Sequence, residues 1–251
     1  MFYKVRYRLL ALGMLFVGAH LSWNSWKYSN QKYVSGDTAP WVVFDFDGTL
    51  VNSFELVVDT CNQLAQEYGF DPITDEQKSH LRCMSTKDII TKHLKISWLK
   101  LPFLHKRATA IMAQKIPNLS LVSGMEDVLR SLKAQGYRLG ILSSNSEEGI
   151  RGFLKNNNIE IFDSVHGGSS IFGKHRVIKS FLSDGNLDPK NVIYVGDEIR
   201  DIQATTQVGV AIVAVDWGFS SRESLLAHKP NKLISHPSEL VSALKSISLL
   251  G

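Results

Sequence analysis

The stretch WVVFDFDGTLVN, residues 41–52, runs from an uninterrupted apolar segment directly into two aspartates separated by a single residue. The segment WVVF shows no alternation of apolar and polar residues, which is typical of a strand covered on both faces of a parallel sheet. Asp45 and Asp47 stand at its carboxyl end, where open parallel sheets bind their ligands. Two nearby carboxylates oppose each other's ionisation, so their placement side by side indicates a chemical role.

Short apolar runs alternate with amphipathic segments from residue 40 onward, as expected for strands and helices around a parallel sheet. Strands are predicted at 41–44, 139–142, 192–195 and 211–215, with weaker candidates at 163–165 and 232–234. Helices are predicted at 125–135, 147–156, 177–183 and 199–208. The fold class is therefore predicted to be α/β, with a parallel sheet covered on both faces.

Residues 53–122 break this alternation, because they contain no comparable apolar strand run. Apolar residues recur there at helical spacing, first through 54–68 and again through 101–112. The segment is too long for a loop. We therefore predict an inserted all-helical cap at 53–122, packed over the end of the first strand, and a core built from 39–52 and 123–251.

The first 38 residues differ in charge from the rest of the chain. They hold five basic residues and one acidic residue, which accounts for the whole formal net charge of +4. Residues 39–251 carry 23 basic and 23 acidic residues, so we expect no nucleic-acid partner. With only Cys61 and Cys83 present, neither a disulfide framework nor a structural zinc site is indicated.

An uncharged stretch, residues 9–26, follows the basic N-terminus. A membrane anchor needs about 20 apolar residues, and this stretch reaches that length only by including several polar ones. A secretory signal needs a small-residue cleavage site, and Ala19-His20-Leu21 is a poor one. Membrane association through 9–26, a cleaved signal and a simple tail (residues 1–38) stay open. We expect a cytoplasmic catalytic domain, whether or not it is anchored, and favour a secreted or periplasmic location less.

Polar residues also follow the other apolar runs of the predicted sheet. Ser143 and Ser144 follow the second run, and Asp197 and Asp201 follow the third. Lys174 follows a glycine-rich segment that precedes the third run. Helix capping explains one such residue per strand, but not several acids, a lysine and a hydroxyl at one sheet edge. The set fits phosphoryl transfer through a covalent aspartyl phosphate.

The carboxylates of this set have distinct predicted tasks. Asp45 is predicted to be the nucleophile. Asp45, Asp197, Asp201 and the main-chain carbonyl of Asp47 are predicted to hold Mg²⁺, which prefers carboxylate, phosphate and water oxygens. Asp47 is predicted to protonate the leaving alkoxide and later to take a proton from the attacking water. The crowding of the two aspartates then raises the pKa of Asp47, as this task requires.

The remaining residues of the set are predicted to bind the phosphate. Lys174 would neutralise negative charge, and Ser143 would donate a hydrogen bond to a phosphate oxygen, with Ser144 or Asn145 contributing. Gly48 would let the chain turn so that main-chain N–H groups face the phosphate.

Five further residues, in two groups, are left out of the predicted site. We interpret Glu198 and Arg200 as solvent-facing salt-bridge partners. Trp217 and the two residues after it, just past the strand predicted at 211–215, would either edge the pocket or pack in the core.

The motifs together resemble those of a known family. DFDGTLVNS from residue 45, LSSN at 142–145, the lysine of FGKH and VGDEIRD at 195–201 resemble the four motifs of the haloacid dehalogenase superfamily. The resemblance covers about residues 40–240 and is greatest to the phosphoglycolate phosphatase-like branch, which inserts a helical cap after the first motif. It implies a three-layer Rossmann-like core, Mg²⁺ as cofactor, Asp45 as nucleophile and Asp47 as acid and base.

The function predicted from these residues is Mg²⁺-dependent hydrolysis of a small phosphomonoester metabolite. A phosphomutase or a phosphonatase of the same superfamily is the near alternative, and the basic segment 87–115 keeps a cap lysine available for the latter. The alternative from another class is a membrane-tethered binding protein without catalysis. The complete set of reacting residues argues against it.

Overall fold

The computed structural model describes residues 39–168 and 173–248. The predicted N-terminal segment 1–38, with its apolar stretch 9–26, lies outside these residues. Across the described ranges, no helix combines the length and the apolar character needed to cross a membrane.

One sheet of six parallel strands forms the centre of the described chain, in the order β3-β2-β1-β4-β5-β6. The strands are β1 (Trp41–Phe44), β2 (Arg138–Leu142), β3 (Ser164–His166), β4 (Val192–Gly196), β5 (Ala211–Val215) and β6 (Lys232–Ile234). Each coincides with a predicted apolar run to within one residue. β1 lies inside the sheet between β2 and β4, in a register that places Trp41 opposite both Arg138 and Val192.

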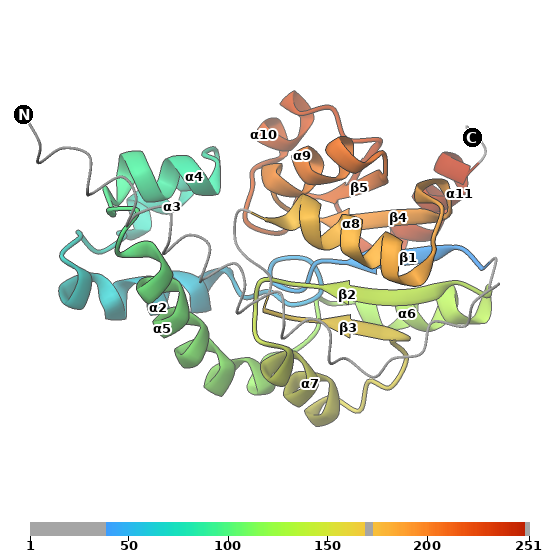
Figure 1. Ribbon diagram of the computed structural model, residues 1–251, viewed down its shortest axis with the longest axis horizontal. Helices are drawn as coiled ribbons and strands as arrows, with labels where there is room; N and C mark the ends of the chain where they lie inside the picture. The colour runs from blue at the N-terminus through green and yellow to red at the C-terminus, as the bar shows by residue number, and fades with distance from the viewer. Residues whose placement is uncertain (1–38, 169–172, 249–251) are drawn as a thin grey trace, which may run out of the picture.

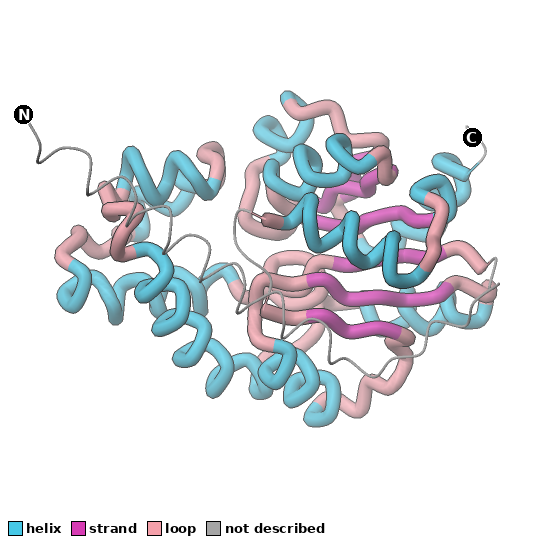
Figure 2. Tube along the Cα trace, in the orientation of Figure 1, coloured by secondary structure: helices cyan, strands magenta, loops and turns pink. Residues whose placement is uncertain are grey.

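Helices cover both faces of the sheet. Successive side chains of a strand point to opposite faces, and in β1 the side chains on both faces are apolar. Val42 and Phe44 of β1 belong to one apolar cluster, and Trp41 and Val43 belong to another on the opposite face. The first is covered by α6 (Met125–Ala134), α7 (Glu147–Asn156) and α11 (Leu240–Ser248), and the second by α8 (Lys174–Gly185), α9 (Ile199–Val208) and α10 (Arg222–Ala227). Figures 1 and 2 show the sheet between these helices, with α8 crossing in front. The predicted three-layer α/β fold is confirmed.

The segment between β1 and α6 is helical, as predicted. It contains α2 (Phe54–Tyr68), α3 (Asp75–Leu81), α4 (Thr86–Asp88), a π-helical turn η1 (Ile89–His93), α5 (Leu101–Lys115) and a 3₁₀ turn η2 (Ile116–Asn118). We call α2 to α5 the cap; Figure 1 shows these helices grouped to one side of the sheet. Val58, Leu64, Ile90 and Leu104 belong to a third apolar cluster, made within the cap. The cap therefore has an apolar core of its own.

Candidate active site

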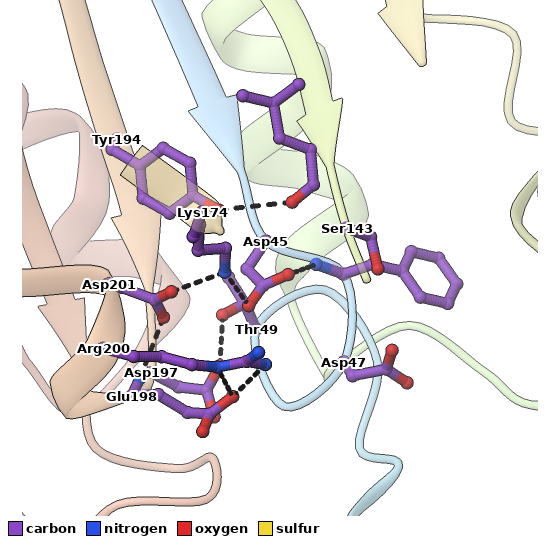
Figure 3. Close-up of polar contacts among 12 residues, drawn as sticks. Asp45, Asp47, Thr49, Ser143, Lys174, Tyr194, Asp197, Glu198, Arg200 and Asp201 are labelled. Carbon is purple, nitrogen blue, oxygen red and sulfur yellow. Dashed lines mark hydrogen bonds and ion pairs between the residues drawn. The ribbon is translucent and has the colours of Figure 1, made fainter. Parts of the chain in front are cut away.

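Asp45 occupies the first position after β1, and its backbone continues the pairing with β4. Its N–H donates to the Val195 carbonyl at 2.9 Å. The buried carboxylate accepts hydrogen bonds on both oxygens: Oδ1 from the Phe46 N–H at 2.8 Å and Oδ2 from Lys174 Nζ at 2.5 Å. Figure 3 shows Lys174 reaching Asp45 and Asp201 together. The strand end therefore holds this carboxylate in one orientation, beside a buried cation.

Asp45, Asp197 and Asp201 form a buried triad of carboxylates. Each offers one oxygen, and these oxygens lie within 4.8 Å of one another. Asp201, at the start of α9, also accepts from Lys174 Nζ at 2.5 Å and from the Glu198 N–H at 3.0 Å. The Lys174 cation and the charge of Arg200 offset part of the negative charge of these carboxylates. Hard oxygen donors with an excess of negative charge match the ligand preference of Mg²⁺.

Asp197 is held by contacts from two further loops. Oδ1 accepts from the Thr49 hydroxyl at 2.7 Å, and Oδ2 accepts from the Phe219 N–H at 2.7 Å. Gly48 and Gly218 pack so closely that a Cβ atom built on either would lie 2.2 Å from Asp197 Oδ2. Gly48 also has a φ of 74°, which favours glycine. The absence of a side chain at these two positions makes the space for Asp197.

Burial dominates the electrostatics of the triad, because removal from water disfavours a charged carboxylate. It raises the pKa of Asp45 against the opposing charge of Lys174. It likewise raises the pKa of Asp201 to about 6, and that of Asp197, where the Glu198 charge adds to the effect. For Lys174, burial lowers the pKa, but the carboxylates of Asp201 and Asp45 outweigh it and raise the pKa well above its usual value.

Asp47 lies apart from the triad, on the other side of Asp45 in Figure 3. Its half-buried carboxylate accepts a hydrogen bond from Asn145 Nδ2 at 3.2 Å. Its Oδ1 atom and the Ser53 hydroxyl oxygen are buried with no hydrogen-bond partner within residues 39–168 and 173–248. Burial raises the pKa of Asp47, although neighbouring hydrogen-bonding groups oppose this. A carboxyl that retains its proton can act as an acid.

Two of the predicted phosphate ligands, Ser143 and Ser144, directly follow β2, whereas Lys174 begins α8. Ser143 is buried; its N–H donates to the His166 carbonyl, and its hydroxyl oxygen accepts from the Asn145 N–H, both at 3.0 Å. Ser144 is half-buried beside it. Gly48 has the positive φ expected of a turn glycine, 74°, and its own N–H donates to the Val51 carbonyl at 2.9 Å within that turn.

Two residues interpreted as solvent-facing lie instead against the site. The Glu198–Arg200 ion pair is confirmed, with Arg200 Nε 2.7 Å from Glu198 Oε1, but the side chains are only 12% and 21% exposed. Thr86 of the cap donates its hydroxyl to Glu198 Oε2 at 2.6 Å. The solvent-facing interpretation was wrong because the sequence gives no sign that the cap covers this pair.

Sequence reasoning also missed Thr49, and gave Asn145 only a secondary role. Both contact predicted site carboxylates through side-chain hydrogen bonds. Their positions in the sequence could have indicated this role, because Thr49 follows Gly48 and Asn145 follows the two serines.

Comparison with known proteins agrees with this architecture. Residues 42–215 match the model of the haloacid dehalogenase-like hydrolase family. The chain is 37% identical over 207 residues to the phosphoglycolate phosphatase of Synechococcus elongatus, covering 82% of this chain and 97% of that protein. It is 24% identical over 227 residues to the pyrophosphatase PpaX of Bacillus mycoides, with the same two coverages of 82% and 97%.

A solved structure shares the fold. The crystal structure of a predicted phosphatase from Clostridium acetobutylicum superposes with a TM-score of 0.71 at 21% identity, covering 83% of this chain and 99% of that one. The predicted resemblance to the phosphoglycolate phosphatase-like branch is thus confirmed by a curated relative. The chain belongs to the haloacid dehalogenase-like hydrolase family.

Proposed function

We propose that this protein is a Mg²⁺-dependent phosphatase that hydrolyses a small phosphomonoester through an aspartyl phosphate on Asp45. The observation that carries the proposal is the juxtaposition of a buried carboxylate triad, paired with Lys174, and a separate half-buried Asp47. The names of the curated relatives, a phosphoglycolate phosphatase and a pyrophosphatase, support phosphate-ester or phosphoanhydride hydrolysis.

In the first step, an Asp45 oxygen attacks the phosphorus atom, and the bond from phosphorus to the leaving oxygen breaks. Asp47 gives its proton to that oxygen, so the alcohol leaves neutral. The raised pKa of Asp47 supports this task, since the group must still hold its proton when the substrate arrives. The Asn145 amide, 3.2 Å from Asp47 Oδ2, orients the carboxyl.

In the second step, water attacks the phosphorus atom of the aspartyl phosphate and the bond to Asp45 breaks. Asp47, now a carboxylate, takes the proton from the water, which releases inorganic phosphate and restores both aspartates. Lys174 and Ser143 bind the phosphoryl oxygens in this proposal. The cation of Lys174 lies where negative charge accumulates.

Asp45, Asp197 and Asp201 would hold Mg²⁺, with the predicted contribution of the Asp47 carbonyl. The fit rests on three buried carboxylates, each with one oxygen within 4.8 Å of the others. When bound, Mg²⁺ lowers the repulsion between a phosphate and the attacking carboxylate.

Two of the lysines in the basic cap segment 87–115, Lys92 and Lys100, argue against the phosphonatase alternative. Lys92 forms an ion pair with Asp88 at 2.7 Å, and Lys100 donates to the Tyr68 carbonyl at 3.1 Å. Both contacts lie within the cap. These lysines therefore have partners there, whereas Lys174 of the core contacts Asp45.

A panel of phosphomonoesters tests the proposal, assayed for phosphate release with and without Mg²⁺. Phosphoglycolate comes first and pyrophosphate is included, because the relatives' names point to them. Asp45→Asn is expected to lower release by at least about 10⁴-fold, while Asp127→Asn, at an exposed position on α6, leaves it unchanged. Release that Asp45→Asn does not lower would refute the mechanism, and no release from any substrate would refute the function.

A further inference from the structure

A short turn of the cap contacts two core loops that hold metal-ligand carboxylates. The turn links α3 to α4, and its Cys83 contacts Ser221 and Ser224 of the core. Arg82 in the turn and Thr86, the first residue of α4, make the polar contacts that lead to the metal-ligand carboxylates. We call these two residues the latch. Each lies more than 110 residues from its core partner in the chain, so only the docking of the cap onto the core creates these contacts.

The first contact runs through Glu198, next to Asp197 in the chain. The Thr86 hydroxyl donates to Glu198 Oε2 at 2.6 Å, while Glu198 Oε1 accepts from Arg200. The main-chain N–H of Glu198 donates to Asp201 Oδ2 at 3.0 Å. One residue therefore receives a hydrogen bond from the cap on its side chain and gives one to a triad carboxylate from its backbone.

The second contact runs through the loop after β5. The Arg82 guanidinium donates to the Gly218 carbonyl, and the Arg82 carbonyl accepts from the Ser221 N–H at 2.7 Å. Between these two positions, the Phe219 N–H donates to Asp197 Oδ2 at 2.7 Å. The Phe219 ring also packs edge-on against the ring of Phe54, over which Arg82 lies.

We propose that Arg82 and Thr86 are positioning residues that couple the docking of the cap to the placement of Asp197 and Asp201. The inference rests on the proposed function, because it concerns the same metal-ligand carboxylates. Substrate must enter between cap and core, and closure then excludes water and completes the site. If the latch contacts form only when the cap docks, Asp197 and Asp201 are held less firmly in the open enzyme. The affinity of the open enzyme for Mg²⁺ is then lower.

Thr86→Val tests the first contact, because valine keeps the shape and removes the hydroxyl. We expect the dissociation constant for Mg²⁺, measured by titration calorimetry, to rise about tenfold, the size expected for losing one hydrogen bond to a charged acceptor. Hydrogen exchange in segment 195–201 should accelerate, since the Glu198 amide depends on this arrangement. Thr86→Ser should restore both.

Thr91→Val is the matched control. Thr91 also lies in the cap, but its hydroxyl donates to the Lys87 carbonyl of its own helical segment at 2.8 Å. We expect Thr91→Val to leave Mg²⁺ affinity and exchange in 195–201 unchanged. An equal effect of both valine variants would mean that the cap is merely destabilised, and would overturn the proposal.

Two further variants test whether the latch acts through its named partners. The effects of Thr86→Val and Glu198→Gln should not add in the double variant, because both break one contact. Arg82→Met should accelerate exchange in 217–221 more than in 195–201. Additive effects, or unchanged exchange in every latch variant, would overturn the proposal. Exchange and calorimetry need no turnover, so a failed substrate panel would refute the phosphatase function without deciding this test.

Discussion

The ion pairs of the sheet core and those of the cap differ in their exposure to water. In the core, Lys174 is 5% exposed and lies 2.5 Å from two buried carboxylates, whereas in the cap Lys92 is 72% exposed and lies 2.7 Å from Asp88. The distances are similar, but water screens the second pair and not the first. The two regions therefore differ in the burial of their ion pairs, while the ion-pair distances are similar.

The two regions also differ in how their apolar residues are used. The core packs apolar side chains on both faces of the sheet, while the cap has one cluster and leaves Leu99 and Phe103 exposed. The cap reaches the site through the latch rather than through a buried charge of its own. The residues of the proposed chemistry therefore lie in the core, and the cap contacts them through Glu198 and the loop after β5.

The largest expected effect comes from breaking the buried charge cluster. Lys174→Met leaves Asp45 and Asp201 buried without their cation, so we expect it to lower the free energy of unfolding by about 3–5 kcal/mol. Lys92→Met in the cap should change it by less than about 0.5 kcal/mol. Urea unfolding of both variants in EDTA measures the difference. Equal effects would contradict the contrast between the two regions.

A cavity in the core should destabilise the whole chain, whereas a cavity in the cap should destabilise the cap alone. Leu129 of α6 and Leu64 of α2 are both fully buried, one beneath the sheet and one inside the cap. Leu129→Ala should destabilise the whole chain by about 2–5 kcal/mol. Leu64→Ala should accelerate hydrogen exchange in α2 and α5 while the strands keep their protection. Loss of strand protection in Leu64→Ala would show that cap and core unfold as one unit.

A smaller, pH-dependent effect is expected at Asp163, on the far side of the core from the cap. Its carboxylate accepts from Lys133 at 2.7 Å, from Arg138 at 3.0 Å and from the Leu139 N–H at 2.8 Å. Although burial raises the pKa of Asp163, these contacts, led by Lys133, outweigh it and lower the pKa. Asp163→Asn should cost about 1–2 kcal/mol at neutral pH.

The sign of the pH dependence follows from the lowered pKa. The stabilisation by Asp163 is fully present above the pKa of the unfolded chain, about 3.9, and is lost as the pH falls through the folded value. Urea unfolding at several pH values should therefore show the wild-type and Asp163→Asn chains converging at acidic pH. A constant difference down to about pH 2 would contradict this.

The smallest expected effect concerns reactivity rather than stability. Burial raises the pKa of the Cys61 thiol to about 11, while Cys83 is exposed. Cys61 should react with a disulfide reagent at pH 8 about 100-fold more slowly than Cys83, because little of it is thiolate. Denaturant should abolish the difference. Rapid labelling of both thiols in the folded protein would show that the interior of the cap opens readily.

Most of the fold could be predicted because buried parallel strands are continuous apolar runs. This places Trp41–Phe44 and Val192–Gly196 in the sheet, with Asp45 and Asp197 directly after them at one edge. Strand direction brings these two ends together, whatever the detailed packing. What could not be predicted was the burial of Glu198 and its contact with Thr86, because that contact depends on how the cap docks.

The sequence by itself determined the parallel α/β core, the helical insertion and the order of polar residues along the sheet edge, because these follow from local periodicity and from the ends of strands. The sequence also predicted Asp45, Asp197 and Asp201 as joint metal ligands, and the tertiary structure decided that they share one buried space. It united Asp45, Asp197 and Asp201, left Asp47 apart beside Asn145, and linked the cap to the site through Thr86. The physical reason is that burial and long-range contacts depend on packing, which local sequence patterns do not encode.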